Sequence, residues 1–131
     1  MAGAEYPRQA RLLNSAQFKA VFDDSRFRVS TRELLVLSRP NGLEHARLGI
    51  VVGKKNCRLA TGRNRVKRLV RESYRHNQSA LAGLDIIVLA RRGIAELDNG
   101  AITQHLTKLW NRLNRTFRES VAASCAASAS P

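Results

Sequence analysis

Residues 85–91 constrain the fold more than any other segment, because they are apolar on both alternating faces of a strand. The alternate positions share small or aliphatic side chains, Ile86, Val88 and Ala90 on one side and Ile87 and Leu89 on the other. A strand of this kind is covered on both sides, so we expect it in the centre of a sheet. The run is far shorter than the roughly 20 apolar residues that span a membrane, and we predict no membrane association.

Two other segments are predicted as strands, residues 33–37 and 48–52, because they are short and aliphatic and are bounded by turn residues. Residues 26–30 extend or precede the first of them. Pro40-Asn41-Gly42 is a turn signal between the two, and it favours direct antiparallel pairing of residues 33–37 with residues 48–52.

Three helices are predicted around these strands. The first begins at Asn14 or Ser15 and runs through Asp24, and the second begins with Thr61 as its N-cap and runs to about Arg75. The third begins at Asp98 or Asn99, and apolar residues recur along it at helical spacing: Ile102, Leu106, Leu109, Trp110, Leu113 and Phe117. At 131 residues the chain has room for one domain. We therefore predict a small α+β domain over residues 1–120, followed by a disordered tail of small residues at 121–131.

The charge of the chain is strongly unbalanced. Lys and Arg number 23 against 10 Asp and Glu, and the net charge is +13. Residues 54–75 hold nine of the cations and one acid, Glu72, so they alone contribute +8. Such clustering favours a polyanion such as nucleic acid, whose phosphates release counterions when cations neutralise them. No segment has the features of a secretory signal, and we expect a cytosolic location.

The second predicted helix divides into an apolar and a basic side. Val66, Leu69, Val70 and Tyr74 gather on one side, and the cations occupy the other. Arginine grips phosphate with two parallel hydrogen bonds, and asparagine can bond to a base edge or a ribose hydroxyl. Glu72 is predicted to orient Arg68 and Arg75. The candidate nucleic-acid ligands are Lys54, Lys55, Arg63, Asn64, Arg65, Lys67, Arg68, Arg71 and Arg75.

A basic helix can also be only a solvated surface, although such a face normally mixes both signs of charge. The same alternative applies to the third predicted helix, whose outer side is either solvated or a secondary contact with nucleic acid. The cations on that side are Lys108, Arg112, Arg115 and Arg118.

No side-chain set for catalysis or metal binding is visible. His45, His76 and His105 are scattered. Asp23-Asp24 is the only adjacent acidic pair, and it lies where a helix is predicted to end, with no third ligand nearby in the sequence. Cys57 and Cys125 are too few for a disulfide framework and are predicted to be free thiols. We therefore predict no catalytic residue and no metal bound by protein side chains.

The basic segment resembles the signature of one family, the protein subunit of bacterial ribonuclease P. The matching residues are Arg63-Asn64-Arg65-Val66-Lys67-Arg68, followed by Arg71-Glu72-Ser73-Tyr74-Arg75. Further landmarks fall in order: Arg11-Leu12, Phe18, Phe22, Arg47-Leu48-Gly49, Lys54-Lys55 and residues 85–91. The resemblance covers about residues 8–118. It departs from the family pattern at Ala60-Thr61-Gly62, where many members have Ala followed by an apolar residue.

The resemblance implies a two-layer α+β architecture of the ribosomal-protein type, with a mainly antiparallel sheet. The basic helix would lie in a left-handed β-α-β crossover, contrary to the usual rule, and would contact the catalytic RNA subunit. The single-stranded 5′ leader of precursor tRNA would bind a cleft formed by Phe18, Phe22 and Lys54. The spacing of the two phenylalanines fits core packing as well as base stacking.

The implied reaction is endonucleolytic removal of the leader, with magnesium bound chiefly by the RNA subunit. Two alternatives stay open on the sequence. A ribosomal or general RNA-binding protein would share the size and charge. A DNA-binding protein could place the same helix in a major groove.

Overall fold

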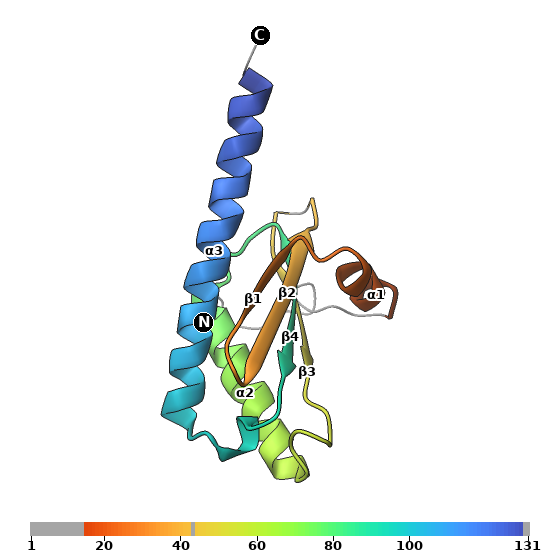
Figure 1. Ribbon diagram of the computed structural model, residues 1–131, viewed down its shortest axis with the longest axis vertical. Helices are drawn as coiled ribbons and strands as arrows, with labels where there is room; N and C mark the ends of the chain where they lie inside the picture. The colour runs from red at the N-terminus through yellow and green to blue at the C-terminus, as the bar shows by residue number, and fades with distance from the viewer. Residues whose placement is uncertain (1–14, 43, 130–131) are drawn as a thin grey trace.

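The computed structural model describes residues 15–42 and 44–129, and it describes the side chains of residues 16–42 and 44–121. The elements follow the order α1 (Ser15–Asp23), β1 (Phe27–Ser30), β2 (Leu34–Pro40), β3 (Arg47–Val51), α2 (Ala60–Asn77), β4 (Leu84–Ala90), the short 3-10 helix η3 (Ile94–Glu96) and α3 (Asn99–Ala129) (Figure 1). This arrangement confirms the predicted α+β class.

The four strands form one mixed sheet in the order β1-β2-β4-β3. β1 pairs with β2 and β2 with β4 in antiparallel fashion, whereas β3 and β4 are parallel. The central position predicted for residues 85–91 is confirmed, and residues 26–30 form a separate strand. The predicted direct pairing of residues 33–37 with residues 48–52 is wrong. β4 lies between β2 and β3, where its residues are apolar and buried on both faces of the strand.

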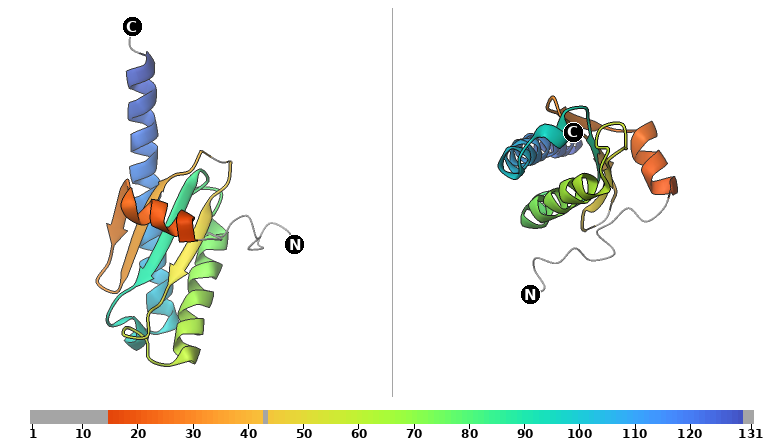
Figure 2. Two further views of the ribbon diagram at one scale, coloured as in Figure 1. Left: turned by 90° about the vertical axis from the view of Figure 1, so that its right-hand side faces the viewer. Right: turned by 90° about the horizontal axis from the view of Figure 1, so that it is seen from below.

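The chain passes from β3 to the parallel strand β4 through α2. In the left view of Figure 2, β3 lies to the right of β4, both strands run downward, and α2 passes behind the sheet. This path has the left-handed sense that the resemblance implied. The register places Arg47 opposite Asp85, and two hydrogen bonds of 2.7 and 2.6 Å join the Arg47 guanidinium to the Asp85 carboxylate. The ion pair thus ties the two parallel strands together at the end where they begin.

Helices cover the two faces of the sheet unequally (Figure 2). α2 and α3 pack against one face and enclose the main core, which includes Leu48, Ile86 and Trp110. On the opposite face, here called the α1 face, a smaller cluster of Val21, Leu37 and Ile87 lies beneath α1. One short helix covers only part of that face, so the sheet keeps accessible surface there.

α2 is held against α3 near its C-terminal half. The Tyr74 and Trp110 rings meet edge to face with centroids 6.2 Å apart, and Trp110 Nε1 donates a 2.8 Å hydrogen bond to Ser73 Oγ. The apolar side predicted for α2 is confirmed by the burial of Val66, Leu69, Val70 and Tyr74. Burial on one side leaves the other side of the helix in solvent.

α2 begins two residues earlier than expected. Its N-cap is Leu59, and no side chain caps it, so the prediction that Thr61 is the N-cap is wrong. Cys57 is buried beside the first turn, and a Cβ added to Gly62 would lie 2.8 Å from Cys57 Sγ. The preceding loop therefore packs closely against the first turn of α2, and position 62 has no room for a side chain.

α3 begins as predicted and ends later than predicted. Asp98 Oδ1 accepts a 2.7 Å hydrogen bond from the backbone N–H of Ala101, which confirms Asp98 as the cap. The helix continues through Ala129, whereas a disordered tail was expected from residue 121. Alanine has the highest intrinsic helix propensity, and residues 122–129 contain five alanines.

Candidate nucleic-acid interface

The exposed side of α2 carries side chains that the fold itself does not use. Asn64, Arg68 and Arg71 are exposed, and Lys67 is half-buried. None of the four side chains has a hydrogen bond or an ion pair with another residue in the described parts of the chain. Because the opposite side of α2 is anchored in the core, these side chains extend from a rigid support. Their donor groups remain available for an anionic ligand.

The two arginines of the first turns have a different environment. Arg63 Nη1 donates to the carbonyl oxygens of Cys57 and Arg58, both at 3.0 Å. Arg65 donates to Asn99 Oδ1 at 2.6 Å and to the Leu97 carbonyl at 3.1 Å. These bonds connect α2 to the loop before it and to the start of α3. Sequence reasoning grouped Arg63 and Arg65 with the other cations because it could not locate these carbonyls.

The remaining predicted ligands lie at the two ends of the helix. Lys54 and Lys55 are exposed in the loop after β3. Arg75 is half-buried, and its guanidinium lies 4.0 Å from the Glu72 carboxylate. Glu72 has no such contact with Arg68, so its predicted orienting role has structural support only for Arg75.

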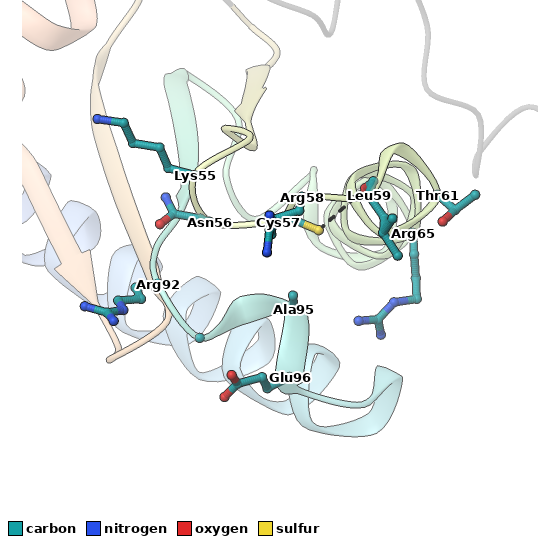
Figure 3. A pocket seen from close by; sticks show the side chains of 12 residues that line it. Lys55, Asn56, Cys57, Arg58, Leu59, Thr61, Arg65, Arg92, Ala95 and Glu96 are labelled. Atoms are coloured by element: carbon teal, nitrogen blue, oxygen red, sulfur yellow. Dashed lines mark hydrogen bonds between the residues drawn. The ribbon is translucent and has the colours of Figure 1, made fainter.

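A pocket of about 540 Å³ lies beside the start of α2 (Figure 3). Its walls come from the loop after β3, the first turn of α2, and the segment that follows β4. The cations in its lining are Lys55, Arg58, Arg65 and Arg92. Arg58 and Arg92 were absent from the predicted ligands. Arg58 belongs to the same basic run, which was a usable signal, whereas the position of Arg92 depends on the β3-α2-β4 crossover.

The α1 face holds the second group of predicted residues. Phe18 is partly buried and packs against the small cluster under α1, whereas Phe22 is 45% exposed. Val51, at the end of β3, is 38% exposed, and Lys54 follows it in solvent. The structure thus separates the two phenylalanines: Phe18 contributes to packing, and Phe22 presents an aromatic ring to solvent.

The described residues contain no group of three His, Cys, Asp or Glu side chains that could hold a metal ion. His105 Nε2 lies 3.7 Å from the Glu33 carboxylate, which places this histidine in a contact between α3 and the start of β2. Cys57 is a free, buried cysteine, whereas the side chain of Cys125 lies outside the described residues. In the part of the chain that the structure covers, no helix is long and apolar enough to cross a bilayer.

Comparison with known proteins identifies the family. The ribonuclease P family model matches residues 6–114. A ribonuclease P protein component from Azotobacter vinelandii is 53% identical over 116 residues, which cover 88% of this chain and 89% of that protein. The protein component from Pseudomonas paraeruginosa is 52% identical over 124 residues, covering 93% of this chain and 92% of that protein.

Solved structures give the same result. An RNase P protein from Staphylococcus aureus has a TM-score of 0.72 at 30% identity, covering 78% of this chain and 93% of that chain. The RNase P protein from Thermotoga maritima, in complex with 1-(4-fluorophenyl)-2-thiourea, has a TM-score of 0.70 at 35% identity. The match covers 80% of this chain and 98% of that chain. The chain with the basic helix α2 therefore belongs to the ribonuclease P protein family, whose members are the protein part of a ribonucleoprotein endoribonuclease in tRNA 5′ processing.

Proposed function

We propose that the exposed side of α2 binds the catalytic RNA subunit of ribonuclease P, while the α1 face binds the 5′ leader of precursor tRNA. The observation that carries the first part is the set of unpaired donors on a helix anchored by Trp110 and Tyr74. The protein would hold the two RNAs together in the cytoplasm, and the RNA subunit would perform the cleavage.

Arg68 and Arg71 are the principal phosphate ligands in this proposal. Both are exposed, and they are three residues apart, so they extend from neighbouring turns of α2. A guanidinium can form two parallel hydrogen bonds with one phosphate. Lys67 adds a point charge, and Asn64 can bond to a base edge or a ribose hydroxyl.

Arg63 and Arg65 have a supporting role in the proposal. Each arginine has five N–H donors, and the bonds to loop and α3 carbonyls use only some of them. The remaining donors can contact RNA at the same time. Arg63 and Arg65 would thus both position the helix and contribute positive charge to the RNA-binding surface. Lys54, Lys55 and Arg75 would add further positive charge.

The α1 face suits a single strand of varying sequence. Phe22 offers an exposed ring, and stacking on an aromatic ring accepts any base, contributing about 1–3 kcal/mol per base. Lys54 lies beyond Val51 at the end of β3 and supplies charge at the rim. Phe18 supports the surface from below, since it packs on the small cluster.

Magnesium would be held by the RNA subunit, because the described residues offer no ligand set for it. The cations of α2 would lower the magnesium requirement by reducing phosphate repulsion between the two RNAs. This effect depends on charge, so it should weaken when monovalent salt is raised.

The test is cleavage of a precursor tRNA by the cognate RNA subunit at low magnesium, with the wild-type protein, with Arg68→Ala, and without protein. We expect the wild type to restore cleavage and Arg68→Ala to restore less. Raising magnesium should remove the difference. If Arg68→Ala and wild type act equally at every magnesium concentration, α2 is not the contact; if the wild type adds nothing to the RNA alone, the protein binds RNA only in a general way.

A further inference from the structure

The outer side of α3 carries a row of cations that the proposed function leaves unused. Lys108, Arg112 and Arg115 are exposed, and at 3.6 residues per turn they lie within about 60 degrees of one another around the helix axis. Glu119 is the only acidic residue among residues 99–129. We call Lys108, Arg112 and Arg115 the α3 stripe. The family model ends at residue 114, so the stripe extends beyond the part shared with that model.

The α3 stripe adjoins the free edge of the sheet. β1 is one of the two edge strands, and the Phe27 and Phe117 rings meet edge to face with centroids 5.7 Å apart. Arg112 Nη1 donates a 3.3 Å hydrogen bond to the Ser30 carbonyl of β1. Arg112 therefore stands where the sheet edge meets the helix.

A cation on the α1 face, Arg28, lies at the same edge of the sheet. Phe27 and Val29 of β1 are buried in the main core, so the residue between them, Arg28, projects to the opposite side of the sheet, which is the α1 face. Arg28 is exposed. Among the described residues, neither Arg28 nor any residue of the α3 stripe lies within ion-pair distance of a carboxylate.

We propose that the distal part of the single-stranded leader crosses the β1 edge at Arg28 and continues along the α3 stripe. This inference rests on the proposed function of the α1 face. α2 follows β3 in the chain, and β1 lies at the other edge of the sheet, about 14 Å away at the usual strand spacing. A leader cleaved near the RNA bound by α2 therefore leaves the sheet over β1, and its phosphates meet cations there without any requirement for base identity.

The experiment measures the affinity of the holoenzyme for precursor tRNAs with leaders of about 4 and about 16 nucleotides, lengths that bracket short and long single-strand sites. The variants are Lys108→Ala with Arg115→Ala, which keeps the bond from Arg112 to β1, and the same pair with Arg112→Ala added. The matched control replaces Arg112 and Arg115 by Lys and keeps the charge. Circular dichroism and binding to the RNA subunit alone verify that each variant is folded.

We expect the triple variant to bind the long-leader substrate about tenfold more weakly, with its salt slope reduced by about 2 for three lost phosphate contacts. Short-leader affinity should change less than twofold, and the Lys control should resemble the wild type. Equal losses for both leaders would overturn the proposal, since the stripe would then contact another part of the RNAs. No loss for either leader would show a merely solvated stripe.

Phe22→Ala distinguishes this inference from the function proposed for the α1 face. If Phe22→Ala weakens both substrates and the triple variant weakens only the long one, both proposals hold. If Phe22→Ala changes neither substrate while the triple variant still acts on long leaders, the α3 stripe binds the leader but the α1 face does not. If neither Phe22→Ala nor the triple variant weakens binding of the long-leader substrate, both proposals are wrong.

Discussion

The first turns of α2 and its middle carry the same kinds of side chain, but these side chains have different environments. Arg63 and Arg65 donate to carbonyl oxygens and an amide oxygen of neighbouring segments. Arg68 and Arg71 extend into solvent with no partner among the described residues. The difference arises because the loop before α2 and the start of α3 both approach the N-terminal end of the helix. Proximity to backbone carbonyls, and not residue type, separates arginines that use part of their donors within the fold from those whose donors are all free to bind.

The largest loss of stability is expected from changes at Trp110, because this residue anchors α2 and so supports both groups of arginines. Trp110→Ala removes a fully buried ring and its hydrogen bond to Ser73, and should lower the free energy of unfolding by about 3–5 kcal/mol. Trp110→Phe keeps an aromatic ring but loses the hydrogen bond. It should lower the free energy of unfolding by about 1 kcal/mol in addition to the cost of the smaller ring. Urea unfolding measures both. Comparable losses for the two variants would mean that the hydrogen bond, not the ring, anchors α2.

The free arginines should affect binding without affecting stability. Arg68→Ala with Arg71→Ala should weaken binding to the RNA subunit by about 2 kcal/mol, because charge-assisted bonds to phosphate are lost. The free energy of unfolding should stay within about 0.5 kcal/mol of the wild type, as is usual for exposed positions. Filter binding across a salt series and urea unfolding provide the two numbers. A stability loss above that range would mean that Arg68 and Arg71 also support the fold, as Arg63 and Arg65 do.

Arg63 and Arg65, which donate to neighbouring segments, should affect stability more than Arg68 and Arg71 do. Arg65→Ala breaks the bonds to Asn99 and Leu97 and should lower the free energy of unfolding by about 1–2 kcal/mol. Asn99→Ala removes one of the same bonds, so a double-mutant cycle should show that the two losses are not additive. Additive losses would indicate that Arg65 and Asn99 do not interact in solution.

The smallest effect concerns the start of α2. Gly62→Ala should destabilise the protein, because its Cβ would lie 2.8 Å from Cys57 Sγ. In a Cys57→Ala background the sulfur is gone, and the same substitution should instead stabilise the helix by up to about 1 kcal/mol. Thermal unfolding of the four proteins measures this change of sign. Destabilisation in both backgrounds would mean that contact with Cys57 is not what excludes a side chain at position 62.

Local patterns were sufficient to predict most of the elements. The helical spacing of apolar residues identified α3 and the buried side of α2, and the two-faced pattern of residues 85–91 identified the central strand. The family of the chain was also recognisable from the Arg63-Asn64-Arg65 segment and its continuation. These features depend on residues near one another in the chain, so a sequence displays them directly.

The pairing of strands was less predictable than their existence. Pro40-Asn41-Gly42 is a genuine turn signal, yet β2 does not pair with β3, because β4 arrives from more than thirty residues later and separates them. Likewise, Thr61 had the chemistry of an N-cap, but the helix begins at Ala60 with Leu59 as its N-cap, and the loop before it packs against Gly62. Pairing between distant segments therefore prevailed over a local turn signal in the sheet, whereas at α2 the loop immediately before the helix decided where the helix begins.

The sequence by itself determined that this chain is a strongly basic α+β domain of the ribonuclease P protein family, with its positive charge concentrated on one helix. Only the tertiary structure decided which cations are free, which of the two phenylalanines faces solvent, and that Arg28 and the α3 stripe meet at one sheet edge. The physical reason is that charge and amphipathic period belong to consecutive residues. The partners of a side chain depend on segments that folding brings together from distant parts of the chain.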